Sequence, residues 1–254
     1  MKVLISGASG LIGTELAKQL SALGHQPIRL VRRPVKSADE MFWAPGISDL
    51  DPNSLSDIDA VINLAGATTG KIPWTKTYER ELISSRLDST KTLVDAINAC
   101  PNPPKVLISG SASGIYGDQG DAWLDESSPK GEGFLADLAY KWEEAAKLAK
   151  TRVVLVRTTM VMSKKLGALG KLLPLIKLGI GGALGSGKQW WAWISLEDQA
   201  RAIIHLIENE SASGAYNITA PEPATCQQII KELGRQLKRP TLLRVPAFAM
   251  RLLI

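Results

Sequence analysis

The stretch that decides the fold is Gly7-Ala8-Ser9-Gly10-Leu11-Ile12-Gly13. In the glycine-rich turn of a Rossmann unit, the first glycine permits a tight turn and the second lets the backbone approach a pyrophosphate. The third lets the following helix pack closely on the strand. The free N–H groups at the start of that helix then face the phosphates. The phosphate-binding residues expected from this pattern are Gly7, Ser9, Gly10, Leu11, Ile12 and Gly13.

A glycine triplet alone is a weak signal, and the alternative is a purely structural turn. Here the triplet directly follows a strand predicted over residues 2–6. It opens an amphipathic helix predicted over residues 11–23, with Leu11, Leu16 and Leu20 on one face and Gly24 after its last residue. Strand, glycine turn and helix in this order are the context that a dinucleotide-binding fingerprint requires.

The second predicted strand, residues 27–31, indicates which dinucleotide the turn would hold. A site for NAD usually has an acidic residue about 20 residues beyond the glycines, which binds the ribose 2′-hydroxyl. No carboxylate is near Val31, and Arg32 and Arg33 follow it. Because a guanidinium binds a phosphate in bidentate fashion, this pair favours NADP as the cofactor. The alternative is a solvated turn before Pro34.

Strands and helices alternate through the first half of the chain. Short runs rich in Val, Ile and Leu are typical of strands buried on both faces of a parallel sheet. Such runs lie at residues 2–6, 27–31, 60–64, 105–109 and 152–157, with a shorter candidate at 41–44. Helices are predicted at residues 11–23, 75–99 and 134–150. The expected fold class is α/β, a Rossmann-like doubly wound parallel sheet.

The pattern changes after about residue 160. Residues 166–187 contain seven glycines and one proline among leucines, which does not fit a regular Rossmann repeat. We interpret them as part of a small C-terminal lobe that covers the crevice at the carboxyl ends of the strands. The pattern that follows predicts a helix over residues 195–209, a strand over residues 215–219 and a helix over residues 225–238. We expect an NADP-binding domain over residues 1–160 and a mainly substrate-binding lobe over residues 161–254, which is interleaved with the last Rossmann elements in one compact unit.

Composition argues against several other classes of protein. The 254 residues are 45% hydrophobic and 22% charged, as in soluble globular proteins. No apolar run reaches the ~18–20 residues of a membrane span, and no signal peptide precedes the first strand. We therefore expect a cytoplasmic protein without a membrane partner. Cys100 and Cys226 have no zinc or disulfide spacing, and no metal is expected. The net charge of +5 comes from interspersed charges, so we expect no nucleic-acid partner.

The motifs together resemble the extended and atypical short-chain dehydrogenase/reductases of the epimerase/dehydratase type. The resemblance is closer to a bacterial "epimerase family" subgroup of uncertain substrate that has a eukaryotic mitochondrial relative. Members usually continue some forty residues beyond the point where this chain stops. The matching strings are SGASGLIG (from Ser6), VINLAGA (from Val61), WTKTYERELISSR (from Trp74), SGSASGIYGD (from Ser109), KWEEAA (from Lys141), VVLVRT (from Val153) and LGIGGALGSGKQWWAWI (from Leu178).

This resemblance implies roles for residues after two central strands. Asn63, Leu64, Ala65 and Gly66 would line the adenosine and the inner ribose of the cofactor. Ser109 and the turn after it would lie beside the nicotinamide. The structural interpretation of residues 61–66, a buried strand followed by a tight turn, is compatible with these contacts. The resemblance also places a dimer interface on the helices from Thr75 and Phe134, so we expect a monomer or a homodimer.

The family's catalytic pattern is broken in this chain. Short-chain dehydrogenases use a Tyr-x-x-x-Lys pair, which lies on one face of a helix, together with a serine or threonine. The fourth residue after Tyr140 is Glu144, and alignment on Trp142 places Leu135 and Ala139 where the tyrosine and lysine would be. The serine position falls on Ala112, and a shift of one residue gives Ser111 or Ser113.

Several polar residues are candidates to replace the missing pair. The candidates for catalysis are Ser111, Tyr116 and Tyr140, with Ser113, Glu143 and Lys188 as further polar groups. The alternative for Tyr140 is a half-buried packing residue, because aromatic side chains on helices often have that role.

Lys188, Gln189 and Trp191 are the candidates for substrate binding, in a glycine-rich segment that lets the backbone approach a ligand. Trp190, Trp191 and Trp193 would stack on a ring of the substrate or pack the lobe onto the sheet. Arg157 ends the fifth long predicted strand, where it would bind cofactor or substrate, or pair with Glu197 or Asp198.

The sequence favours NADP(H)-dependent oxidation or reduction of a small organic substrate, with epimerisation as a subcase. The alternative is a sensor or scaffold that binds NADP(H) and performs no chemistry. A third interpretation, association with nucleic acid, has only the basic pI in its favour.

Overall fold

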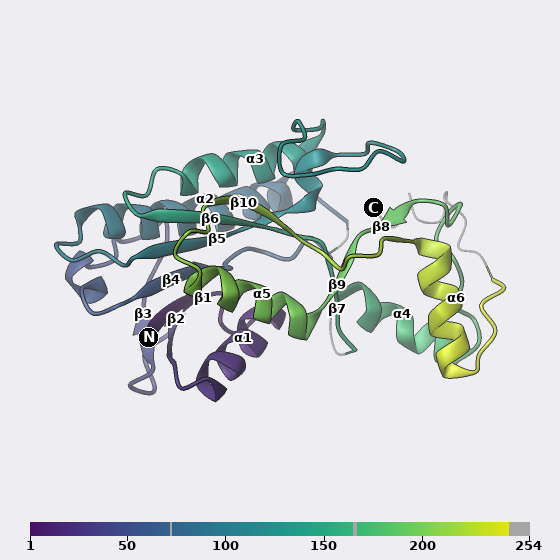
Figure 1. Ribbon diagram of the computed structural model, residues 1–254, viewed down its shortest axis with the longest axis horizontal. Helices are drawn as coiled ribbons and strands as arrows, with labels where there is room; N and C mark the ends of the chain where they lie inside the picture. Colours follow the sequence, from purple (N-terminus) through teal and green to yellow (C-terminus); the bar gives the residue numbers. More distant parts are fainter. Residues whose placement is uncertain (72, 165–166, 244–254) are drawn as a thin grey trace.

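The computed structural model describes residues 1–71, 73–164 and 167–243 and has a seven-stranded parallel sheet at its centre (Figure 1). The strand order is β10-β6-β5-β4-β1-β2-β3. From β1 the chain winds outward to β2 and β3, then returns to β4 and winds the other way, which confirms the Rossmann-like doubly wound sheet. The seven strands are β1 (Lys2–Ser6), β2 (Gln26–Val31), β3 (Glu40–Phe42), β4 (Ala60–Asn63), β5 (Val106–Ala112), β6 (Arg152–Thr158) and β10 (Gly214–Ile218).

Helices cover both faces of this sheet. In Figure 1, α2 (Lys76–Ala99) and α3 (Phe134–Ala146) lie above it, and α1 (Leu11–Ala22) and α5 (Leu196–Glu208) lie below it. Successive strand residues point to opposite faces. In β1, Val3 and Ile5 therefore join one hydrophobic core and Leu4 joins the other. Both faces of the sheet are therefore buried, which explains why the central strands read as nearly continuous apolar runs.

Hydroxyl side chains fix where three of the helices begin. The Thr75 side chain accepts a hydrogen bond from the Tyr78 amide and caps α2. Ser195 caps α5 in the same way. Thr225 caps α6 (Cys226–Leu237) and completes a capping box with Gln228. These caps satisfy N–H groups that the first turn of a helix leaves without partners.

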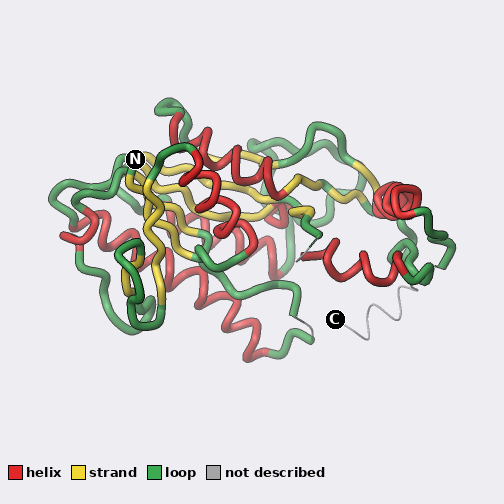
Figure 2. The backbone as a smooth tube through the Cα atoms, turned by 90° about the horizontal axis from the view of Figure 1, so that it is seen from below, coloured by secondary structure: helices red, strands yellow, loops and turns green. Residues whose placement is uncertain are grey.

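A small lobe extends beyond one end of the sheet (Figures 1 and 2). It contains α4 (Gly167–Lys177), α6 and the antiparallel pair of β8 (Trp190–Trp191) and β11 (Ala224–Thr225). Its own core is formed by Ile176, Ala183, Cys226 and Ile230. The strands β7 (Met160–Met162) and β9 (Trp193–Ser195) pair between the lobe and the main sheet.

The structure differs from the sequence-based expectation in two elements. The helix expected over residues 134–150 ends at Ala146. The glycine-rich stretch after residue 166 contains a helix, α4, with Pro174 inside it. The glycines and the proline of this segment disfavour a helix. Leu172 and Ile176 nevertheless have helical spacing, four residues apart, and both pack in the lobe core.

Three further observations concern the described part of the chain. No helix within it combines the length and the apolarity of a bilayer span. No group of His, Cys, Asp or Glu side chains within it has a geometry that would hold a metal ion. Cys100 and Cys226 are both buried free thiols.

Candidate functional site

The glycine turn between β1 and α1 requires glycine on steric grounds. Gly7 has φ +69°, and a Cβ at this residue would lie 2.5 Å from the Leu64 carbonyl oxygen. A Cβ at Gly13 would lie 2.3 Å from the Gly7 carbonyl oxygen. Because real Cβ atoms do not approach backbone this closely, both residues are fixed by the packing of strand, turn and helix. This is the close packing that the sequence pattern predicts.

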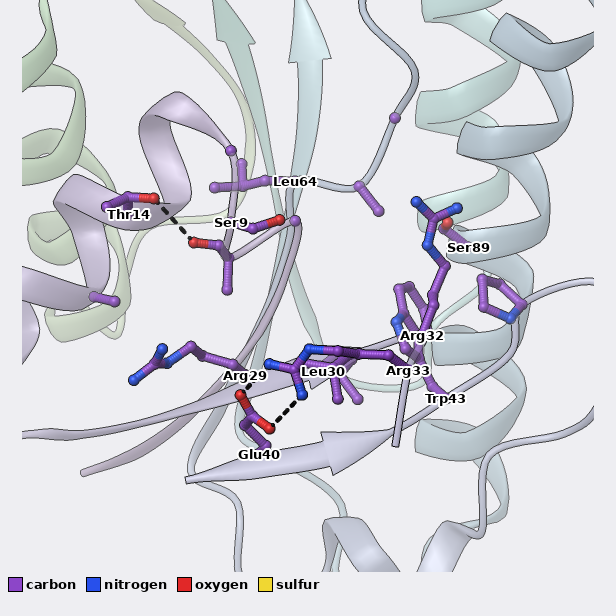
Figure 3. Close-up of a pocket in the computed structure, with 18 of the residues that line it drawn as sticks. Ser9, Thr14, Arg29, Leu30, Arg32, Arg33, Glu40, Trp43, Leu64 and Ser89 are labelled. Atoms are coloured by element: carbon purple, nitrogen blue, oxygen red, sulfur yellow. Dashed lines mark hydrogen bonds and ion pairs between the residues drawn. The ribbon is translucent and has the colours of Figure 1, made fainter. Parts of the chain in front are cut away.

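The beginning of α1 is open to an anion. Gly10 is its N-cap residue, no side chain caps the helix, and no acidic residue lies in its first turn. The first N–H groups of any helix have no partner within that helix. The Thr14 hydroxyl donates to the Ala8 carbonyl oxygen at 3.3 Å, which holds the turn against the helix (Figure 3). The arrangement suits a phosphate group.

A cavity of about 1370 Å³ lies over this turn. Its walls come from the glycine turn, the end of β2, the segment after β3, the segment after β4 and one side of α2. The cavity exceeds the ~300–1,000 Å³ of a typical small-molecule pocket, so it accommodates a dinucleotide. The expected cofactor residues that line it are Gly7, Ser9, Gly10, Arg32, Arg33, Leu64, Ala65 and Gly66. The other three residues of the fingerprint, Leu11, Ile12 and Gly13, form the first turn of α1 next to it.

The two arginines after β2 have different environments. Arg33 binds the Glu40 carboxylate through two hydrogen bonds of 2.6 and 2.9 Å. The hydrogen bond from Arg33 lowers the pKa of Glu40 to about 2, so the pair stays charged. Arg32 lines the cavity, and no described residue pairs with it. In Figure 3 the Arg33 side chain points toward Glu40 and the Arg32 side chain points away from it. Arg32 is thus the cation available to a ligand.

Three expected cofactor residues have side chains that hydrogen-bond within the fold. Asn63 is fully buried, accepts from the Ser6 hydroxyl at 2.6 Å and donates to the Thr90 hydroxyl at 2.9 Å. Ser109 is fully buried, and its hydroxyl donates to the Gly110 carbonyl oxygen. Arg157 pairs with Glu143. None of these three side chains lines the cavity.

Sequence reasoning missed part of the cavity wall. Trp43, which follows β3, lines it, as do Ser85 and Ser89 of α2. The serines lie four residues apart on one helical face, a spacing that the sequence displays. No sequence signal marked Trp43, because its place depends on how β3 pairs with β2.

A closed polar network lies behind the carboxyl ends of β5 and β6. The Glu143 carboxylate of α3 accepts from Arg157 Nε at 2.8 Å and Nη2 at 2.9 Å, and from the Ser111 hydroxyl at 2.6 Å. Arg157 Nη1 donates to the Tyr116 hydroxyl, which donates to Asn217 Oδ1 at 2.7 Å. The hydrogen bonds from Arg157 to Glu143 raise the pKa of Arg157 above its ordinary value.

This network decides between the alternatives for Arg157. The proposed pairing with Glu197 or Asp198 is wrong, because β6 directs the guanidinium to Glu143 on α3. Asp198 pairs with Arg201, its neighbour one turn along α5.

Two of the three catalytic candidates meet in this network, and the third lies apart. Ser111 and Tyr116 are both buried and hydrogen-bonded. Tyr140 is 45% exposed and lies on the outer side of α3 with Lys141 and Glu144. Tyr140 therefore has neither a place beside Ser111 nor the half-buried packing position considered for it.

The positions of the missing catalytic pair carry apolar side chains. Leu135 is 41% exposed and Ala139 is buried against Ile115 and Tyr116. None of the four tyrosines of the chain is followed four residues later by lysine. Neither helix position therefore supplies a group that moves a proton.

The candidate substrate residues lie in the lobe. Trp191 is half-buried and packs against the lobe core. Lys188 and Gln189 are exposed, and the Gln189 amide donates to the Leu184 carbonyl oxygen at 3.0 Å. Trp190 Nε1 donates to the Asp121 carboxylate at 2.6 Å, which ties the lobe to the loop after η2 (Ser113–Tyr116).

Comparison with known proteins matches residues 3–219 to the NAD dependent epimerase/dehydratase family. An epimerase family protein of Mycobacterium leprae is 40% identical over 252 residues, covering 98% of this chain and 81% of the relative. The human epimerase family protein SDR39U1 is 37% identical over 254 residues, covering 97% of this chain and 84% of the relative.

Solved structures agree with this assignment. The crystal structure of human SDR39U1 (isoform 2) with NADPH has a TM-score of 0.91 and 32% identity, covering 100% of this chain and 86% of that chain. UDP-glucuronic acid 4-epimerase from Bacillus cereus has a TM-score of 0.80 at 20% identity, covering 97% of this chain and 87% of that one. The second likeness shows a shared fold.

Proposed function

This chain belongs to the NAD dependent epimerase/dehydratase family, and we propose that it is an NADP(H)-dependent oxidoreductase or epimerase-like enzyme acting on a small organic substrate. The observation that carries the proposal is the free guanidinium of Arg32 at the cavity over the glycine turn. A similar chain, human SDR39U1, has been crystallised with NADPH. The nicotinamide of a bound cofactor would supply the hydride chemistry.

Each part of the cavity wall has a defined task in this proposal. The N–H groups of Leu11 and Ile12 at the start of α1 bind the pyrophosphate. The backbone of residues 64–66 lies against the ribose. Arg32 binds the 2′-phosphate, and Glu40 keeps the neighbouring Arg33 in place by a bidentate ion pair. The fit rests on the glycine cradle, whose close backbone contacts leave no room for a Cβ.

Proton transfer follows a different route from the Tyr-x-x-x-Lys pair. Ser111 of β5 and Tyr116 of η2 are the candidate hydroxyl groups, and the Glu143–Arg157 pair holds both in place. Their burial limits the substrates to those that carry their own acidic or basic group near the reacting carbon. We place the substrate between the sheet edge and the lobe, with Lys188, Gln189 and Trp191 on the lobe side.

The second candidate function is a sensor that binds NADP(H) and performs no chemistry. It is favoured by the apolar side chains of Leu135 and Ala139 and by the closed network around Glu143. Both functions share the same cofactor site, so only turnover separates them.

The test combines binding and turnover. Titration calorimetry with NADPH and NADH measures which nucleotide the protein prefers, and we expect NADPH to bind more tightly. Absorbance of the reduced nicotinamide is then followed with a panel of carbonyl compounds and alcohols. Turnover of any of them supports the enzyme. Tight NADPH binding with no turnover of any compound in the panel favours the sensor. Failure to bind NADPH overturns both proposed functions.

A further inference from the structure

Two arginines of this fold have opposite surroundings. Arg157 is buried and has Glu143, Tyr116 and a backbone carbonyl as hydrogen-bond partners. Arg86, on α2, is half-buried and makes one hydrogen bond, from Nη1 to the Leu82 carbonyl oxygen at 3.0 Å. No aspartate or glutamate in the described part of the chain forms an ion pair with Arg86.

Arg86 is held between a glycine and an indole ring. Its Cζ lies 5.2 Å from the centre of the Trp142 ring. A Cβ at Gly66 would lie 3.1 Å from that Cζ, so the guanidinium packs directly against the Gly66 backbone. Trp142 is fixed in turn, because its Nε1 donates to the Thr90 hydroxyl at 2.9 Å. The contacts with Trp142 and Gly66 therefore fix the position of the Arg86 guanidinium.

That place adjoins the cavity at Gly66, although Arg86 and Trp142 are not themselves among the residues that line it. Gly66 follows β4 and lines the cavity. Trp142 touches β5, since a Cβ at Gly110 would lie 2.7 Å from the far edge of its ring. The Arg86–Trp142 stack thus lies beside the carboxyl ends of β4 and β5, where open α/β sheets bind their ligands.

An unpaired guanidinium is costly in this position. Burial lowers the pKa of Arg86 from its ordinary value, which is the signature of a cation that lacks a compensating acid. A guanidinium has five N–H donors, and the fold uses one of them in a hydrogen bond. The acidic residues Glu81 and Asp88 of the same helix line the cavity from another helical face, five residues before and two residues after Arg86. An anionic ligand would supply the counter-charge that the described part of the fold does not.

We propose that Arg86 binds an anionic oxygen-bearing group, a phosphate or a carboxylate, beside the carboxyl ends of β4 and β5. The proposal rests on the proposed function, because it assigns that anion to the substrate and so makes the substrate an organic acid or a phosphate ester. The same chemistry has a second source, the pyrophosphate of the cofactor. The Trp142 ring provides a flat apolar wall behind the guanidinium, and Gly66, which the guanidinium contacts, lines the cavity.

The test uses the full chain with Arg86→Met, Arg86→Lys and the control Arg80→Met, which removes an exposed arginine from the same helix. Calorimetry gives the Kd for NADPH of each protein. Melting temperatures of the NADPH complex are then measured with inorganic phosphate or acetate added, chloride replacing them at equal ionic strength. We expect phosphate or acetate to raise the melting temperature of the wild type and of Arg80→Met. Arg86→Met should lose this increment while its Kd for NADPH changes by less than about threefold, and Arg86→Lys should keep part of the increment.

A different pattern assigns the anion to the cofactor. In that case Arg86→Met weakens NADPH binding by ~10-fold or more, the scale of a lost hydrogen bond to a charged group, while Arg80→Met does not. The proposal is overturned if Arg86→Met matches Arg80→Met in both measurements, since Arg86 then only packs on Trp142. Melting temperatures of the ligand-free proteins provide the folding control: we expect Arg86→Met to be at least as stable as the wild type. Failure of the wild type to bind NADPH would instead count against the proposed function.

Discussion

The two ends of the crevice treat charged side chains in opposite ways. At the β2 end, Arg32 borders a large open cavity and has no partner among the described residues. At the β5 and β6 end, Arg157, Glu143, Ser111 and Tyr116 form a buried network of hydrogen bonds. The comparison teaches that residue type alone does not identify a binding group. What matters is whether the fold has already used its hydrogen-bonding capacity.

Breaking the polar network around Arg157 and Glu143 should have the largest effect on the stability of the protein. Arg157→Met leaves the Glu143 carboxylate buried without its cation, and we expect a loss of ~3–5 kcal/mol in the free energy of unfolding. The double variant Arg157→Met/Glu143→Leu removes both charges and should recover most of that loss. Chemical denaturation of the three proteins measures both values. Equal losses in the single and double variants would show that the ion pair is not what the network depends on.

The glycine turn gives the next largest effect. In Gly13→Ala the new Cβ would lie 2.3 Å from the Gly7 carbonyl oxygen, so strand and helix must separate. We expect ~1–3 kcal/mol of lost stability, as in other overpacked sites, together with loss of NADPH binding. Gly114→Ala is the matched control, because its Cβ would meet only Leu135 at 3.9 Å. Tight NADPH binding by Gly13→Ala would contradict the role given to the turn.

At the β2 end of the crevice, we expect two adjacent arginines, Arg32 and Arg33, to differ in how much they contribute to NADPH binding. Arg32→Gln should weaken NADPH binding by ~10–100-fold, since a hydrogen bond to a charged group contributes ~1.5–3 kcal/mol, and should leave NADH binding unchanged. The double variant Arg33→Gln/Glu40→Gln removes a self-contained pair and should change NADPH affinity by only a few-fold. Because the pKa of Glu40 is lowered to about 2, the contribution of the pair is present above the ordinary carboxyl range and is lost only as the pH falls toward 2. Assays at neutral pH therefore see the intact pair. A larger effect from the double variant would reverse the assignment.

The smallest effect is expected at Tyr140. Its ring lies on the outer side of α3, so Tyr140→Phe should change stability by less than ~0.5 kcal/mol and leave turnover unchanged. Tyr116→Phe removes a hydroxyl between Arg157 and Asn217 and should cost more. Denaturation curves and the nicotinamide assay compare the two. A selective loss of turnover in Tyr140→Phe would restore that residue as a catalytic candidate.

Local sequence was sufficient for the fold and for the glycine turn between β1 and α1. The strand of residues 2–6 coincides with β1 because Val, Leu and Ile in a short run fit a sheet buried on both faces. The glycine turn was recognisable because its steric demands act between neighbours in the chain. The helix α4 was not predicted, since its glycines and Pro174 argue against a helix until the lobe core selects Leu172 and Ile176.

The sequence by itself determined the doubly wound sheet, the cradle at Gly7–Gly13 and the presence of two arginines after β2, because each follows from short-range sterics and periodicity. Only the tertiary structure decided that Arg33 is engaged and Arg32 is free, and that Arg157 is neutralised and Arg86 is not. The reason is physical. The availability of a charge depends on partners from other elements, as when Arg157 of β6 meets Tyr116 of η2, 41 residues away.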